Sequence, residues 1–139
     1  MQIDNDYLKQ LLEAFAAASS PTTDIEELKT RGLDYSTAQF LFHMEILQDK
    51  GLIAQADGDP YIGVLRSIDG HVSWGAVPLR LTAAGHEFLE GMRNEQAMAI
   101  VKRDFKHASI ETMKTVFKSV LTETAAVTAR AMIRGPHGF

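Results

Sequence analysis

The His86-Glu87 pair in the stretch GHEFLE is the part of the sequence that comes nearest to a catalytic metal motif. A zinc protease helix needs two histidines four residues apart, so that both imidazoles lie on one face beside a glutamate base. Position 90 holds Glu90 instead of a second histidine. We therefore expect His86 to make a local hydrogen bond, and we predict no metal site there.

Other catalytic arrangements are absent from the sequence. The chain has no cysteine, which excludes thiol catalysis, disulfides and cysteine-ligated zinc. It also lacks a glycine-rich phosphate loop and a nucleophile elbow. We expect a protein that is not an enzyme and that acts by binding, without a cofactor or a small-molecule substrate.

Charge is distributed unevenly along the chain. The 139 residues are 45% hydrophobic, which is enough for one domain with a core. Residues 1–60 carry four basic against eleven acidic residues, whereas residues 61–139 carry ten basic against seven acidic ones. Such asymmetry is typical of a nucleic-acid face, or of halves that pack together or dimerise head to tail. No apolar run approaches the roughly 20 residues of a membrane span, so we expect a cytoplasmic protein without membrane contact.

Helical periodicity predicts three helices in the first third of the chain. Each has a capping signal at its start: Asp4 or Asn5 for the first, Thr23 with Glu26 for the second, and Ser36 with Gln39 for the third. Gly32 and Gly51 are expected to end the second and third helices, because glycine readily takes up the left-handed backbone conformation.

The pattern changes to that of strands after Gly51. The stretch Tyr61–Pro78 is rich in β-branched and aromatic residues, and its Asp69-Gly70 pair favours a two-residue hairpin turn. A short return strand, LRLT, leads to Thr82, which can cap a further helix. This helix is expected to run on as far as Phe105, and a last helix to begin near Ser109. Its apolar face is predicted to comprise Ile110, Met113, Phe117, Val120, Leu121, Thr124 and Val127.

Two stretches of the chain resemble a known family. They are YSTAQFLFHMEILQDKGLIAQ, with its Phe42-His43 pair, and LRLTAAGHEFLEGMRNE. Together they resemble a bacterial and prophage family catalogued as domain of unknown function 2513. The resemblance implies a winged-helix-like fold and a home in phage or prophage DNA, and it implies no activity.

The predicted fold class is α+β, mainly α. We expect a winged helix-turn-helix domain at residues 1–82, made of three helices and a β-hairpin wing. Residues 83–139 are predicted to form a two-helix C-terminal extension that packs on this domain or on a second subunit.

The predicted third helix is apolar on two sides. One stripe, with Phe40 and Met44, can dock on the core, while a second stripe lies nearly opposite and consists of Ala38, Phe42 and Ile46. Our first hypothesis is that this second stripe makes protein contacts in a homodimer or with a host or phage protein. His43 lies between the stripes and is either a contact residue or a buried, hydrogen-bonded histidine.

The alternative hypothesis is a DNA-binding transcriptional regulator. The third helix carries Glu45 and Asp49 against a single terminal lysine, which is unfavourable for phosphate binding. Contacts to duplex DNA would therefore need residues from the wing and from the basic second half of the chain. The candidates are Thr37, Gln39, His43, Arg66, His71, Lys102, Arg103 and Lys106.

Overall fold

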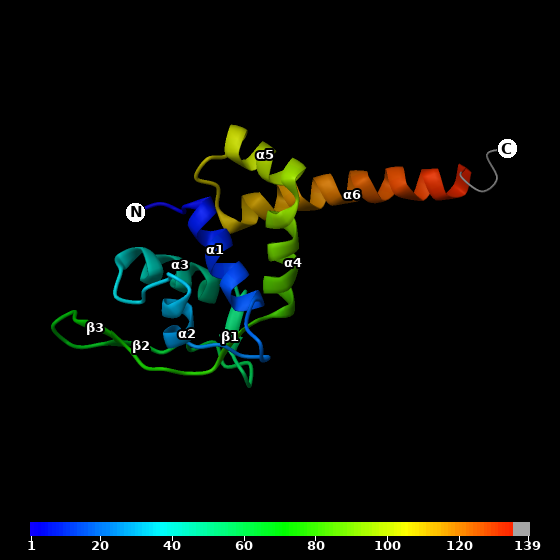
Figure 1. Cartoon of the computed structure of the whole chain (residues 1–139). Coiled ribbons are helices and arrows are strands. Elements are labelled where there is room, and N and C mark those ends of the chain that lie inside the picture. Colours follow the sequence, from blue (N-terminus) through cyan, green and yellow to red (C-terminus); the bar gives the residue numbers. More distant parts are fainter. Residues whose placement is uncertain (135–139) are drawn as a thin grey trace. The chain divides into compact units, whose positions relative to one another are not determined.

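The computed structural model describes residues 1–134, with side chains for residues 1–123, and these residues form six helices and two small antiparallel sheets (Figure 1). The expected α+β, mainly α class is confirmed at this level. The chain divides into two compact units, Met1–Leu89 and a second that begins at Glu90. The division falls within the fourth helix, whereas the domain boundary predicted from the sequence precedes that helix. Within the described residues, no helix has the length and apolar character that a bilayer span requires.

Helix α1 spans Asn5–Ala16 and begins at the predicted cap. The carboxylate of Asp4 accepts the backbone N–H of Tyr7 at 3.1 Å, which satisfies one of the free donors of the first turn. Its apolar side chains point into unit 1 and are buried: Leu8, Leu11, Leu12, Ala14 and Phe15.

Helices α2 (Ile25–Thr30) and α3 (Ala38–Asp49) are each capped one residue later than predicted. Asp24, not Thr23, caps α2 by accepting the Glu27 N–H at 2.9 Å. Thr37, not Ser36, caps α3 by accepting the Phe40 N–H at 3.1 Å. The Thr23 prediction is wrong because the backbone of this residue pairs with Leu79. Ser36 donates its N–H to Asp34 within the preceding turn.

Glycines end α2 and α3 as predicted. Gly32 has φ +88° and Gly51 has φ +67°, and both N–H groups bond back to carbonyls in the preceding turn. Glycine adopts this left-handed conformation without the steric cost that a Cβ would impose.

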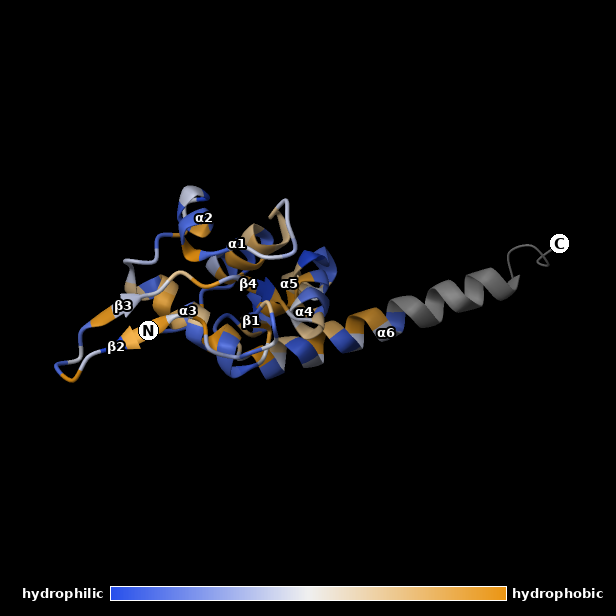
Figure 2. Ribbon diagram, turned by 90° about the horizontal axis from the view of Figure 1, so that it is seen from below, coloured by the Kyte–Doolittle hydropathy of each residue, from blue (hydrophilic) through white to orange (hydrophobic). Residues whose placement is uncertain are grey.

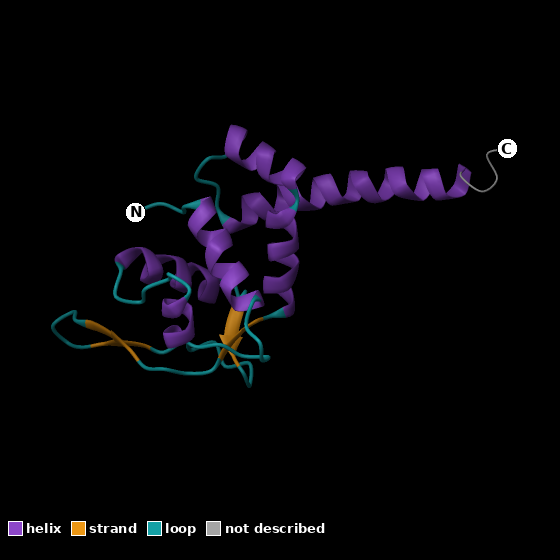
Figure 3. Cartoon of the chain, in the orientation of Figure 1, coloured by secondary structure: helices purple, strands orange, loops and turns teal. Residues whose placement is uncertain are grey.

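A small sheet follows α3. Strand β1 (Ile53–Gln55) pairs antiparallel with β4 (Leu79–Leu81), with Ile53 opposite Leu81 (Figure 3). On the other edge of β4, Thr23 and Leu79 exchange backbone hydrogen bonds of 2.7 and 2.8 Å. The spatial order is therefore Thr23, β4, β1, so the segment between α1 and α2 is tied to the strand that follows the hairpin.

The hairpin consists of β2 (Val64–Arg66) and β3 (Val72–Trp74), which pair antiparallel. The predicted two-residue turn is wrong, because Ser67 N–H bonds to the His71 carbonyl and leaves a three-residue loop. Gly70 occupies the last loop position with φ +85°. This is the other common hairpin solution, in which a turn is followed by a left-handed glycine.

Helix α4 spans Ala83–Arg93 and is capped by Thr82, as predicted. The Thr82 hydroxyl accepts the Gly85 N–H at 3.1 Å and donates to the Gly51 carbonyl at 2.6 Å. Gly85 itself packs directly on the Leu52 carbonyl, where a Cβ would overlap that oxygen. The first turn of α4 therefore fixes the chain segment that leaves α3.

The prediction of one helix from Thr82 to Phe105 is wrong. The helix is interrupted at Asn94. The side chain of this residue caps a separate helix, α5 (Glu95–Asp104), by accepting the Ala97 N–H at 2.9 Å. Asparagine competes with the helical backbone for hydrogen bonds, and this explains the interruption. The region predicted as a two-helix extension, residues 83–139, therefore contains three helices among its described residues: α4, α5 and α6.

Helix α6 spans Ile110–Arg134 and packs on α5 within the second unit. In the part of α6 that Figure 2 colours, hydrophobic and hydrophilic residues alternate along the helix. Four residues of the predicted face are buried: Ile110, Met113, Phe117 and Val120. Leu121 is 44% exposed, which corrects its assignment to the buried face. Thr124 and Val127 lie outside the residues whose side chains are described.

Candidate interaction surface

Helix α3 has one buried side and one outward side. Phe40, Met44 and Leu47 are completely buried in unit 1. About half a turn away, Ala38 is exposed, while Phe42 and Ile46 are half-buried. The stripe singled out from the sequence therefore lies on the outward side of α3, and the contacts within unit 1 leave it partly open.

The hairpin lies against another side of α3. The Trp74 ring meets the Phe40 ring edge-on at 5.3 Å between centroids. The Arg66 guanidinium lies 2.7 Å from the Glu45 carboxylate. Because residues two apart on a strand share a face, Trp74 and Arg66, on neighbouring strands, mark the hairpin face that contacts α3. The exposed Arg66 is thus engaged by an acidic residue of the helix.

We name the outward side of α3, together with the arginine that borders it, the α3–hairpin surface. It consists of Ala38, Phe42, Glu45, Ile46, Asp49 and Arg66. Two other apolar side chains of the hairpin are open to solvent. Leu65 on the opposite hairpin face is 51% exposed, and Ile68 in the loop is fully exposed. This part of unit 1 therefore offers apolar area in two adjoining elements.

Acidic side chains border the C-terminal end of α3. Asp49 is exposed in the last turn. The Gln48 side chain donates to the Pro60 carbonyl at 2.9 Å, which holds the loop with Asp57 and Asp59 beside the helix. The α3–hairpin surface is therefore apolar at its centre and acidic at this end. Such a surface repels phosphate groups.

His43 is a structural residue. Its side chain is buried, with Nδ1 2.8 Å from the Gln39 carbonyl and Nε2 3.0 Å from the Asp4 N–H. A carbonyl only accepts and an N–H only donates, so the ring is neutral with its proton on Nδ1. Burial lowers the pKa of His43 below its ordinary value, against a smaller raising effect of the Gln39 carbonyl and Asp4. The histidine ties α3 to the start of α1 and is withdrawn from any partner.

The other residues of unit 1 that were predicted to contact nucleic acid have different roles in the structure. Thr37 caps α3, and its hydroxyl also donates to the Asp34 carbonyl at 2.9 Å. Gln39 is exposed on the first turn of α3. His71 is exposed in the hairpin, where its N–H donates to Asp69 at 3.1 Å. Gln39 and His71 therefore both offer exposed side chains with no internal hydrogen bond among the described residues.

The basic cluster belongs to the second unit. Lys102, Arg103 and Lys106 are exposed at the end of α5. The Arg103 guanidinium makes two hydrogen bonds to the Asp104 carboxylate, at 2.9 and 2.8 Å, and this contact raises the pKa of Arg103. The exposed fraction of Phe105, between these residues, is 41%. The sequence pattern assigned Phe105 to a helix interior and so missed this exposed aromatic side chain.

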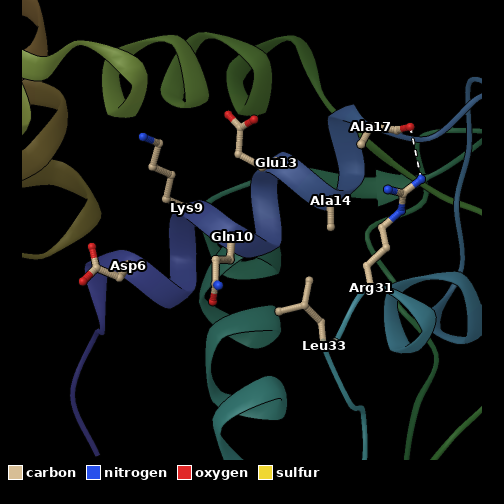
Figure 4. Close-up of a pocket in the computed structure, with 9 residues that line it drawn as sticks. Asp6, Lys9, Gln10, Glu13, Ala14, Ala17, Arg31 and Leu33 are labelled. Atoms are coloured by element: carbon tan, nitrogen blue, oxygen red, sulfur yellow. Dashed lines mark hydrogen bonds between the residues drawn. The ribbon is translucent and has the colours of Figure 1, made fainter.

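A depression of about 710 Å³ lies between α1 and the α2–α3 loop. Its charged groups do not converge (Figure 4). Arg31 donates to the Ala17 carbonyl at 3.2 Å and lies 3.6 Å from Glu27, while Lys9 and Glu13 point along other directions. A small-molecule site needs polar groups directed at one point, so this hollow supports no ligand assignment.

Metal binding also finds no support among the described residues, since no three histidine or carboxylate side chains gather in one place. His86 is exposed on α4, and no such group of three side chains includes it among the described residues.

The Arg66–Glu45 pair was missed by sequence reasoning. The only signal for it was opposite charge, because the strand register that brings the two together is a tertiary property.

Comparison with known proteins identifies one family. A model of the family described as "Hypothetical protein (DUF2513)" matches residues 2–111 of the chain. No curated protein and no solved structure matches the chain.

Proposed function

The chain belongs to the DUF2513 family, and from its surface we propose that it is a non-enzymatic protein-binding module with a winged-helix fold. The order of elements supports the fold: three helices, a strand, a hairpin, a return strand and a further helix. The isolated bridge of Thr23 to Leu79, between α1 and α2, is compatible with this fold.

One observation carries the functional proposal. The outward side of α3, which would enter the major groove in a DNA-reading winged helix, presents Phe42 and Ile46 beside Glu45 and Asp49. A groove-reading helix needs donors toward base edges and cations toward phosphates. Half-exposed apolar side chains with carboxylates instead suit a protein partner, because desolvating them against another apolar surface is favourable.

The protein partner in this proposal is a second copy of the chain, a host protein or a phage protein, in the cytoplasm of a bacterium. The alternative is a transcriptional regulator that binds duplex DNA through Gln39, the hairpin and the basic residues of α5. The exposed side chains of Lys102, Arg103 and Lys106 favour DNA binding. Glu45 counts against DNA binding, because its carboxylate pairs with Arg66, the arginine of the hairpin.

A photo-crosslinking amino acid in place of Phe42 tests the proposal in living cells. We expect irradiation to yield a protein adduct that survives nuclease treatment, and the same amino acid at exposed Ala83 to yield none. An adduct that nuclease removes, or equal adducts at both positions, would contradict the proposal.

The same experiment carries an internal control. Ile46→Asp in the Phe42-labelled protein places a charge beside the crosslinker on the same face of α3. This change is expected to abolish the adduct while the protein remains folded. Persistence of the adduct would show that the label reacts by chance encounter and not within a docked complex.

A further inference from the structure

The end of α5 and the residues that follow form an exposed basic segment with one aromatic side chain, in which Asp104 pairs with Arg103. Phe105 is 41% exposed, and exposed basic residues precede and follow it in the chain. Its N–H bonds to the Val101 carbonyl at 2.8 Å and its carbonyl accepts the Ala108 N–H at 2.9 Å. The backbone around Phe105 is thus fixed on both sides. We name this feature the basic knob: Lys102, Arg103, Phe105 and Lys106.

We propose that the α3–hairpin surface of one copy binds the basic knob of a second copy. This inference rests on the proposed function and names the partner. The two patches are complementary in their apolar side chains and in their charge. The surface presents apolar Phe42 and Ile46 with Asp49 at its acidic end, and the knob presents apolar Phe105 with lysines.

Charge in the two units agrees with this assignment. Residues 1–89, which form unit 1, carry six basic against thirteen acidic residues, and residues 90–139 carry eight basic against five acidic ones. Like surfaces would repel in a symmetric contact of α3 with α3, because Glu45 and Asp49 would face their own copies. A contact of surface with knob brings opposite charges together and removes Phe105 from water.

The contact is heterologous, since it joins two different patches. Each copy carries one surface and one knob, so two copies can satisfy both patches by a reciprocal exchange. If two copies cannot make both contacts at once, the same contact instead builds open chains of copies, whose length grows with concentration.

Charge reversal on full-length protein tests the proposal by sedimentation velocity at low and physiological salt. One variant carries Asp49→Lys with Asp57→Lys, and the other carries Lys102→Glu with Lys106→Glu. Each variant alone places like charges on both patches, so we expect self-association to weaken at least about tenfold. An equimolar mixture restores opposite charges at every contact and is expected to associate as the wild type does.

Lys114→Glu with Lys118→Glu is the matched control, because it makes the same charge change on α6 outside the knob. It is expected to leave self-association unchanged. Phe105→Ala tests the apolar contact made by the basic knob. It is expected to weaken self-association about tenfold without changing the charge of the protein. The rescue in the mixture also shows that both reversed variants are folded.

Wild-type protein that stays monomeric, or a mixture that fails to restore association, would overturn this inference. Crosslinking from position 42 to a different protein would overturn it as well, yet would leave the proposed protein-binding function standing. A nuclease-sensitive adduct at position 42 would instead contradict the proposed function.

Discussion

The guanidinium of Arg66 in β2 lies 2.7 Å from the carboxylate of Glu45 in α3. The contact joins the hairpin to the helix and places a carboxylate beside the side chain that would otherwise be the main cation of the hairpin. In a DNA-binding winged helix, the wing and the recognition helix present separate contacts to DNA. Here the two elements hold each other, and in the proposed function the surface that they form is part of a protein-binding face.

A double-mutant cycle on this pair has a defined outcome. Arg66→Ala, Glu45→Ala and the double variant are expected to give a coupling of roughly 0.2–1 kcal/mol in the free energy of unfolding, because both side chains are partly exposed. The coupling should fall as salt is raised. Hydrogen exchange of the hairpin amides is expected to accelerate in both single variants.

The same cycle on Arg93 and Glu90, which pair at 2.9 Å within α4, serves as the control. Its disruption is expected to leave hairpin exchange unchanged. If Arg66→Ala leaves hairpin exchange as it was, the ion pair does not hold the hairpin on α3.

His43 predicts a pH dependence of stability. Burial lowers the pKa of the folded protein's His43 below its ordinary value. The unfolded chain therefore binds a proton more readily, and the stability contributed by neutral His43 is complete above the unfolded pKa of about 6.5. It is lost as pH falls from there through the lowered pKa of the folded state.

Chemical denaturation between about pH 5 and 8 measures this effect. His43→Gln keeps an acceptor for the Asp4 N–H without a titrating ring, so its free energy of unfolding should vary less over this range. NMR titration should place the His43 pKa below 6.5. A His43 pKa above that value would mean that the ring is stabilised as a cation, contrary to the tautomer that its two hydrogen bonds require.

Two threonines are expected to respond oppositely to the same change. The Thr23 hydroxyl is buried without a hydrogen-bond partner among the described residues, so Thr23→Val should stabilise the protein by about 1 kcal/mol. The Thr82 hydroxyl caps α4 and donates to Gly51, so Thr82→Val should destabilise it by about 1 kcal/mol. Thermal or denaturant unfolding compares the two variants. Equal signs would contradict the hydrogen-bond assignments.

Gly85→Ala tests the packing of α4 on the chain that leaves α3. Alanine normally stabilises a helix interior by roughly 0.5–1 kcal/mol relative to glycine. Here the new Cβ would overlap the Leu52 carbonyl, so we expect a net destabilisation of about 1–3 kcal/mol. His86→Ala at the next, exposed position is the control and should change stability by less than about 0.5 kcal/mol. A stabilised Gly85→Ala protein would refute the close approach.

Much of the fold could be predicted from the sequence, because local signals set most element ends. Asp4, Gly32, Gly51 and Thr82 act where their residue types predict. The errors occur where several residues compete for one role. Thr23 precedes Asp24 and Ser36 precedes Thr37, and the choice depends on whether tertiary pairing occupies the first of the two, as Leu79 does for Thr23.

Less of the candidate surface could be predicted. The amphipathic pattern identified Ala38, Phe42 and Ile46 as a second stripe, and the structure places them on the outward side of α3. The sequence left His43 open between a contact and a structural role. Its structural role includes a hydrogen bond with the Asp4 N–H, which lies 39 residues away in the chain. Phe105 is exposed at the C-cap of α5, a helix end that the sequence pattern did not predict.

Light scattering during size-exclusion chromatography at low salt, with and without a pool of labelled duplex DNA, tests the central claim most directly. The account predicts that the molar mass of the wild-type protein exceeds the 15.4 kDa of one chain. The folded double variant Phe42→Asp with Ile46→Asp is expected to have the mass of a monomer. The labelled DNA is expected to elute separately from both proteins. A protein–DNA complex that dissociates as salt rises and survives the Phe42 and Ile46 substitutions would contradict it.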